Sequence, residues 1–167
     1  MLGDLAATLR PGARVLDAGS GDGALSRHVK RICPEADVTM ADLSPAMLDQ
    51  ARDVPATSVV ADVQRLPFRD NSFDIVVSSW VLETVPEPQR AVSEYLRVLK
   101  QEGQVFATFC SRPERHTGGS DRGALPVGAW SPCGLRPLLN RAKHLHLHPE
   151  VDRLKHEGDE HPQGTRW

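Results

Sequence analysis

The segment VLDAGSGDGALS, residues 15–26, constrains this chain more than any other, because three glycines follow directly after an apolar run. The run predicts a buried strand, and a pattern typical of a helix begins at Ala24. A strand that turns into a helix through Gly19, Gly21 and Gly23 forms a βα turn whose backbone can approach another group closely, since glycine has no side chain. The segment therefore predicts an α/β fold with a ligand site at this turn.

Short apolar runs alternate with helical patterns up to about residue 110, which predicts a doubly wound, mostly parallel sheet with helices on both faces. The expected strands are residues 14–17, 37–41, 58–60, 73–78 and 104–109. The expected helices are residues 24–31, 44–52 and 88–99, and Ser44 is the expected N-cap of the second.

The composition changes after residue 110, where glycine, proline, arginine and histidine become frequent. We divide the chain into a core of residues 1–110, a loop-rich extension of residues 111–148 and a disordered tail of residues 149–167. Within the extension, a short helix is expected from Ser131, and HLHLH predicts a sixth strand through Leu145 and Leu147. The three histidines of that run could bind a metal, but with no acidic or cysteine partner at a useful spacing we predict no metal site.

Net charge and residue content exclude several classes of partner. With a net charge of −2 and no local basic patch, nucleic acid and anionic membranes are poor partners. There is no apolar run of membrane-spanning length and no signal peptide, so we expect a cytoplasmic protein. Cys33, Cys110 and Cys133 have no metal-binding spacing and are expected to be reduced thiols.

Two ligands fit the spacing of the glycine turn. Gly19, Gly21 and Ala24, with Asp42 about twenty residues later, match the fingerprint of a dinucleotide site. The carboxylates of Asp17 and Asp22 would oppose a pyrophosphate there, whereas S-adenosylmethionine carries an ammonium and a sulfonium cation instead of phosphates. The charges of the turn therefore favour S-adenosylmethionine.

Four stretches in the same order resemble class I S-adenosylmethionine-dependent methyltransferases that act on small molecules. They are VLDAGSGDG, VTMADLSPAMLDQAR, ADVQRLPFRDNSFDIVVSSWVLETV and AVSEYLRVLKQEGQVFATF, which together cover about residues 10–110. The resemblance implies a Rossmann-like fold, S-adenosylmethionine as the cofactor and a small-molecule acceptor.

The resemblance also implies which residues hold the cofactor, since ligands of open α/β sheets bind beyond the carboxyl ends of the strands. These are Asp17 and the backbone of Gly19, Ser20 and Gly21 for the methionine end; Asp42, Leu43, Asp62 and Val63 for ribose and adenine; and Ser78 and Ser79 for the methionine carboxylate and the methyl group. Trp80 is expected to pack or to form a pocket wall, and Glu83 to be a solvated carboxylate rather than a base. No catalytic residue is assigned.

Compared with that family, the chain is shortened at both ends: few residues precede the first strand, and we find no seventh strand. An unprotected apolar edge on the fifth strand would follow, which predicts a homodimer through that edge, poor solubility or coverage of the edge by the tail. Two alternatives to an active methyltransferase remain. One is a module that binds the cofactor or a partner without turnover, and the other is a nicotinamide-dependent oxidoreductase.

Overall fold

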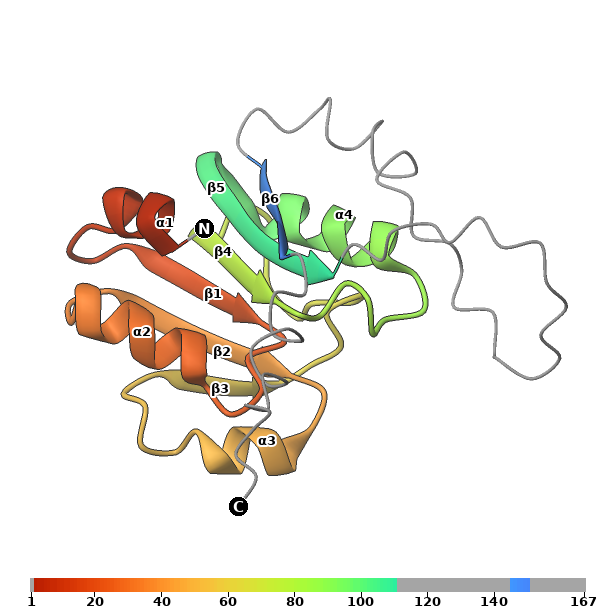
Figure 1. The fold of residues 1–167 in the computed structure, drawn as a ribbon, viewed down its shortest axis with the longest axis horizontal. Helices are drawn as coiled ribbons and strands as arrows, with labels where there is room; N and C mark the ends of the chain where they lie inside the picture. The colour runs from red at the N-terminus through yellow and green to blue at the C-terminus, as the bar shows by residue number, and fades with distance from the viewer. Residues whose placement is uncertain (1, 111–144, 151–167) are drawn as a thin grey trace, which may run out of the picture.

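The apolar runs form a single sheet in the order β3-β2-β1-β4-β5-β6, and every neighbouring pair is parallel (Figure 1). This computed structural model describes residues 2–110 and 145–150. The strands are β1 (Arg14–Ala18), β2 (Asp37–Asp42), β3 (Thr57–Val60), β4 (Phe73–Ser79), β5 (Leu99–Cys110) and β6 (Leu145–Glu150). The helices are α1 (Leu2–Thr8), α2 (Ala24–Ile32), α3 (Pro45–Gln50) and α4 (Pro88–Val98).

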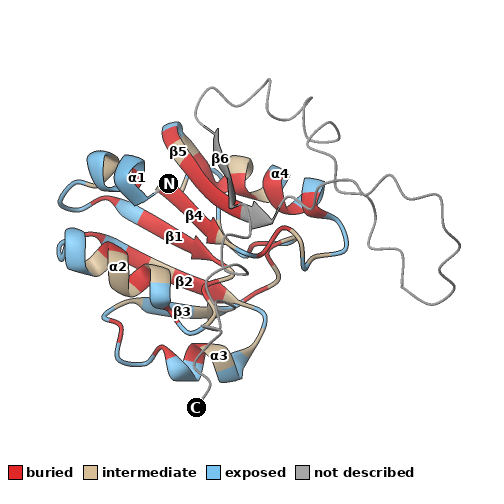
Figure 2. Cartoon of the chain, in the orientation of Figure 1, coloured by how far each residue is buried: buried red, intermediate tan, exposed pale blue. Residues whose placement is uncertain are grey.

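Successive side chains of the central strands point to opposite faces of the sheet, which explains why helices cover both faces. Val15 of β1 packs in one apolar cluster with residues of α1, α2 and α3, whereas the next residue, Leu16, packs in a second cluster with residues of α4. The strands β1, β4 and β5 are accordingly buried, while β3 at the edge is largely exposed (Figure 2). The predicted doubly wound α/β fold is confirmed.

The helices begin where the sequence provides suitable residues. The predicted N-cap Ser44 is confirmed, since its hydroxyl accepts the Met47 N–H at 3.4 Å and Pro45 occupies the first turn. The short helix α1, which buries only Leu5, was not predicted from the sequence. In the described part of the chain, no helix has both the length and the apolar character needed to cross a membrane.

The sixth strand predicted from HLHLH is confirmed as β6, which pairs in parallel with β5 from Val105↔Leu145 to Cys110↔Glu150. The edge of the fifth strand that we expected to be unprotected is covered over this stretch, because the backbone of residues 145–150 pairs with it. The homodimer through that edge stays a prediction. The strand also continues two residues into the segment predicted to be a disordered tail. The helix expected from Ser131 and the side chains of the three histidines lie outside the described residues.

One arginine of α4 fastens the segment that connects β3 to β4. The Arg97 guanidinium donates to the backbone oxygens of Leu66 and Phe68, at 2.9 and 2.8 Å, and to the carboxylates of Asp70 and Glu94. Glu94 in turn accepts the Leu66 N–H at 2.8 Å. These bonds raise the pKa of Arg97 further above its usual value, and they fix the irregular segment onto α4.

Asp17, near the end of β1, is a buried carboxyl group with 1 % of its surface exposed. Its Oδ2 accepts a hydrogen bond from the Ser26 hydroxyl of α2 at 2.6 Å. Burial raises the pKa of Asp17 to about 6, the bond from Ser26 opposes that rise, and the negative charge of Asp42 adds to it. Asp17 therefore joins β1 to α2 directly beneath the glycine turn.

Replacing Asp17 with asparagine should remove a pH dependence from the stability of the protein. A carboxyl whose folded pKa is raised from 3.8 to about 6 binds its proton more tightly in the folded state. The free energy of unfolding therefore falls as pH rises from about 4 to about 6, by about 3 kcal/mol in total. Urea denaturation at pH 4, 5, 6 and 7 should show Asp17→Asn gaining that much over the wild type between pH 4 and pH 7.

A substitution of the hydrogen-bond partner Ser26 also tests whether Asp17 titrates in this range. Ser26→Ala removes the side-chain hydrogen bond that lowers the Asp17 pKa and keeps the backbone one, so the fall in the free energy of unfolding should extend to a higher pH than in the wild type. If the difference in the free energy of unfolding between Asp17→Asn and the wild type does not change with pH, Asp17 does not titrate in this range.

Arg97→Ala should lower the free energy of unfolding by about 2 kcal/mol, because it removes the donor shared by the two backbone oxygens and the two carboxylates, of which Glu94 keeps only the Leu66 N–H. Arg90→Ala on the same helix is the matched control. The Arg90 guanidinium makes an exposed ion pair with Glu87 at 3.7 Å and only a weaker, longer-range electrostatic contribution to Glu94, so its loss should cost less than about 0.5 kcal/mol. Equal losses in the two variants, measured by urea denaturation, would contradict this role of Arg97.

Candidate functional site

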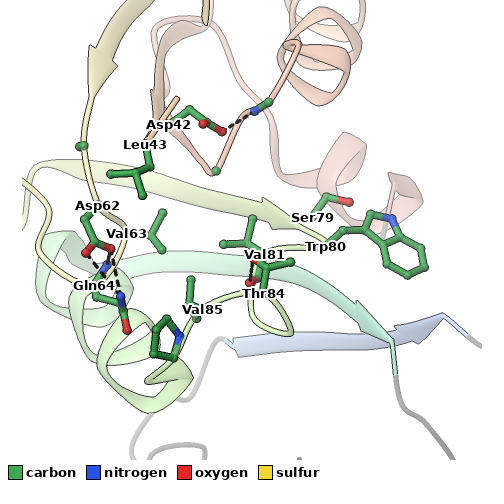
Figure 3. Close-up of a pocket in the computed structure, with 14 residues that line it drawn as sticks. Asp42, Leu43, Asp62, Val63, Gln64, Ser79, Trp80, Val81, Thr84 and Val85 are labelled. Atoms are coloured by element: carbon green, nitrogen blue, oxygen red, sulfur yellow. Dashed lines mark hydrogen bonds between the residues drawn. The ribbon is translucent and has the colours of Figure 1, made fainter. Parts of the chain in front are cut away.

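A cavity of about 570 Å³ lies at the carboxyl ends of β1, β2, β3 and β4 (Figure 3). This is the edge of an open parallel sheet at which ligands bind. Its wall consists of Gly19, Gly21, Asp42, Leu43, Ala61, Asp62, Val63, Gln64, Ser79, Trp80, Val81, Thr84, Val85 and Pro86. Seven of the ten residues that we predicted to bind the cofactor therefore line this cavity.

Gly19 lets the loop after β4 lie directly against the turn after β1. Its φ of +75° is in the left-handed region, which residues with a side chain rarely adopt. A Cβ atom at Gly19 would overlap the Val81 side chain. Glycine is therefore required here for two reasons, the backbone conformation and the close contact with Val81.

The N–H groups of the glycine turn are engaged within the protein. Those of Gly19 and Ser20 donate to the Ala41 carbonyl oxygen, at 2.7 and 3.1 Å. The Gly21 N–H donates to Oδ2 of Asp42 at 2.8 Å. The turn is thus bound to the end of β2 by three hydrogen bonds, and these three donors do not point to a free ligand site.

Two N–H groups at the start of α2 are engaged in the same way. The Gly23 N–H donates to the Ser20 carbonyl oxygen at 2.9 Å, and the Ala24 N–H donates to Oδ1 of Asp22 at 3.1 Å. A phosphate at a helix N-terminus needs free N–H donors. The side chain of Asp22 instead places a negative charge at this position.

Asp42 and Leu43 form the part of the wall that follows β2. Besides the Gly21 N–H, the Asp42 carboxylate accepts the Ser44 N–H on Oδ1 at 2.8 Å. A carboxylate offers roughly four lone-pair sites, so each oxygen keeps capacity for one more donor. Leu43 has 69 % of its surface exposed, which leaves an apolar face beside these oxygens.

The segment after β3 contributes a second carboxylate. Oδ1 of Asp62 accepts the Gln64 N–H at 2.8 Å, whereas Oδ2 is contacted only by the Gln64 side-chain amide at 3.4 Å. The Gln64 Oε1 atom accepts the Glu87 N–H, which ties this segment to the start of α4. Val63 is buried against the wall. Asp62 therefore has one oxygen that can accept a strong hydrogen bond from a ligand.

Ser79 and Trp80 lie at the end of β4. The Ser79 hydroxyl is hydrogen-bonded to the Thr108 hydroxyl of β5 at 2.8 Å. The backbone N–H of Trp80 donates to the Thr108 carbonyl oxygen at 3.3 Å. Trp80 has a φ of +60° and leaves 46 % of its surface exposed at the cavity. The expectation that Trp80 forms a pocket wall is confirmed.

Three predicted residues do not line this cavity. Asp17 and Ser78 are buried, and both are engaged elsewhere: Asp17 by Ser26, and Ser78 by the Ala18 carbonyl oxygen and the Tyr95 hydroxyl. The Ser20 hydroxyl is buried without a hydrogen-bond partner. Their roles toward a cofactor stay predictions, and for Asp17 and Ser78 the structure provides a role in holding elements together.

The charges of the cavity wall have one sign. Asp42 and Asp62 line it, and no lysine, arginine or histidine does so among the residues that the structure describes. Close by in the sequence, both carboxylate oxygens of Glu83 are buried without a hydrogen-bond partner, so the expectation of a solvated carboxylate at this position is wrong. The site is suited to groups that are cationic or donate hydrogen bonds.

The sequence analysis missed the loop residues Val81, Thr84, Val85 and Pro86 of the wall. This loop has neither helical nor strand periodicity, so no repeat in the sequence marks it. Its position directly after a strand that points to the same edge as the glycine turn was the available signal.

Comparison with known proteins identifies the family. The family described as "Methyltransferase domain" matches residues 16–107. The ubiquinone/menaquinone biosynthesis C-methyltransferase UbiE of Pseudomonas paraeruginosa is 31 % identical over 88 % of this chain, and the malonyl-[acyl-carrier protein] O-methyltransferase of Geobacter sulfurreducens is 38 % identical over 68 %.

A solved structure agrees with these sequence matches. The TehB-like SAM-dependent methyltransferase from Corynebacterium glutamicum superposes with a TM-score of 0.57 and 29 % identity, covering 64 % of this chain and 59 % of that one. The chain spans 63 % of the Pseudomonas relative and 45 % of the Geobacter relative, which is less than two thirds of either. The glycine turn, the cavity and these matches agree, and the chain belongs to the methyltransferase domain family.

Proposed function

We propose that this chain binds S-adenosylmethionine in the cavity and transfers its methyl group to a small-molecule acceptor. The observation that carries the proposal is the hydrogen bonding of the glycine turn. The N–H groups of Gly19, Ser20 and Gly21 already have partners within the protein, and the described wall has two carboxylates and no cationic side chain. A cofactor with cationic groups and hydroxyl donors matches this wall.

The same observation argues against a nicotinamide dinucleotide. Its pyrophosphate needs free N–H donors at the turn or at the start of the next helix, and the donors at Gly23 and Ala24 are occupied as well. In addition, its negative charge would lie near Asp22 and Asp42. The motif spacing permits a dinucleotide, but the hydrogen bonds and charges oppose it.

The described residues fit S-adenosylmethionine part by part. Asp42 has unused lone pairs on both oxygens for the two ribose hydroxyls, and the exposed Leu43 offers an apolar face to adenine. Asp62 has a nearly free oxygen for the adenine amino group, with Val63 beside it. We assign the methionine end to the side of the cavity formed by Gly19 and Gly21, next to Ser79.

The bound cofactor would supply a methyl group that its sulfonium already activates for displacement. The tasks left to the chain are to align the acceptor with that methyl group and to exclude water. Val81, Val85 and Pro86 supply apolar surface for this, and Ser79 and Thr84 supply hydroxyl groups. The names of the two relatives, one a C-methyltransferase of quinone biosynthesis and one an O-methyltransferase, support a small-molecule acceptor.

Asp42→Ala should abolish binding of S-adenosylmethionine, with at least about a 100-fold loss of affinity. The substitution removes the ribose acceptors and also the acceptor that holds the Gly21 N–H in place. Asp37→Ala at the opposite end of β2 is the matched control and should bind within about two-fold of the wild type, because Asp37 is exposed and far from the cavity edge. Isothermal titration calorimetry with S-adenosylhomocysteine and S-adenosylmethionine measures both. Unchanged affinity in Asp42→Ala would contradict the assigned site.

Transfer itself is tested with S-adenosylmethionine that carries a tritiated methyl group. A panel of acceptors, with a demethylated quinol and a malonyl thioester as its first members, is incubated with the wild type and with Asp42→Ala. We expect label to enter at least one acceptor with the wild type and none with the variant. Tight binding of the cofactor without transfer to any member of the panel would favour the alternative of a binding module.

A further inference from the structure

We infer that Gln64 is a specificity-determining residue: it holds the Asp62 carboxylate as a hydrogen-bond acceptor, and so selects a purine with a 6-amino group over one with a 6-oxo group. The inference rests on the proposed function, because it takes the adenine of S-adenosylmethionine to lie at Asp62. It is carried by three residues in series, Glu87, Gln64 and Asp62, in which each hydrogen-bonding group fixes the next.

The series begins at a backbone N–H, a group that can only donate. The Glu87 N–H donates to the Oε1 atom of Gln64 at 2.9 Å. Glu87 is the N-cap residue of α4 and its carbonyl oxygen accepts the Arg90 N–H at 2.9 Å, so the helix sets its position. A side-chain amide has one end that accepts and one that donates, and its neighbours decide its orientation. The Glu87 N–H therefore requires the amide oxygen of Gln64 on its side.

The amide nitrogen of Gln64 consequently faces Asp62. Its Nε2 atom lies 3.3 Å from Oδ1 and 3.4 Å from Oδ2 of that carboxylate, and Figure 3 shows the two side chains beside each other. The backbone N–H of Gln64 also donates to Oδ1, at 2.8 Å. Because the oxygens of a carboxylate accept hydrogen bonds more strongly than those of a carboxylic acid, these N–H groups hold Asp62 as an acceptor.

The acceptor character of Asp62 decides which base fits beside it. Asp62 and Gln64 both line the cavity, and Oδ2 has the weaker contacts of the two oxygens. The 6-amino group of adenine donates to such an oxygen, whereas the 6-oxygen of hypoxanthine would face it with no hydrogen between them. The N1–H of hypoxanthine can reach Oδ2 only if the base shifts within the cavity. A polar group without its partner costs binding energy, so the site discriminates between the two bases.

A purely structural role for Gln64 predicts a different result. The bond from Glu87 alone would tie the segment after β3 to α4. Its loss would weaken every ligand of the cavity by a similar factor. A residue that sets the acceptor at Asp62 instead changes the ratio of the affinities for the two bases. The ratio therefore separates the two roles.

Two pairs of probes measure this ratio. S-adenosylhomocysteine and S-inosylhomocysteine share every part except the base, and adenosine and inosine are the same pair without the amino-acid part. All four are titrated by calorimetry into the full chain. We expect the wild type to bind each adenine ligand at least about ten-fold more tightly than its hypoxanthine counterpart.

Gln64→Glu keeps an oxygen that accepts the Glu87 N–H, but it replaces the amide donor with a second acid group beside Asp62. Two adjacent acid groups share a proton, which the site can then donate to a 6-oxygen. We expect the affinity ratio to fall to about two-fold or less. Gln64→Met has a similar size and makes neither bond, and it should lower the ratio at least about three-fold.

The matched controls are Gln89→Glu and Gln89→Met. Gln89 lies on α4, is exposed and does not line the cavity. These substitutions make the same chemical change outside the site, so both variants should keep the affinity ratio within about two-fold of the wild type.

The inference is overturned if the wild type binds the adenine and hypoxanthine ligands equally well, or if a folded Gln64 variant keeps the wild-type ratio. A cooperative unfolding transition in urea shows that a variant is folded, and one folded variant is enough. If the wild type prefers adenosine to inosine through Gln64 but binds no S-adenosylhomocysteine, the base subsite stands and the proposed function fails. If it binds none of the four ligands, both fail.

Discussion

The site depends on the hydrogen bonds between the glycine turn and the end of β2. The Gly21 N–H donates to the Asp42 carboxylate, and the Gly19 and Ser20 N–H groups donate to the carbonyl of Ala41. In many α/β folds the free donors of such a turn bind a phosphate. Here the neighbouring strand takes their place, so the turn keeps its shape without an anion and presents carboxylate oxygens to a ligand.

Several features of the fold keep that turn in position. Beneath it, the buried Asp17 connects β1 to α2 through Ser26, at a cost in stability that grows with pH. Above it, the absence of a side chain at Gly19 allows Val81 to close one side of the cavity. The site therefore uses residues whose conformation or burial is unfavourable in isolation, as is common where function constrains a structure.

The parts of this account that could be predicted from the sequence are those with a local signal. The glycine turn, the N-cap Ser44 and the strand-ending residues Asp42 and Asp62 follow from spacing and residue type. Strand alternation could also have shown that Asp17 and Ser78 face the layers of helices, since Asp17 shares its face with Val15 and Ser78 with Val76. The left-handed backbone of Trp80 and the burial of the Glu83 carboxylate depend on tertiary contacts, which no local pattern in the sequence indicates.

The most direct test of the central claim is a calorimetric titration of the wild-type chain with S-adenosylmethionine and with NADH under the same conditions. We predict micromolar binding of S-adenosylmethionine and no measurable binding of NADH. The reason is that the three N–H donors of the turn and those of Gly23 and Ala24 are already used within the protein, and carboxylates lie beside them. Binding of NADH, or a folded protein that binds neither ligand, would contradict it.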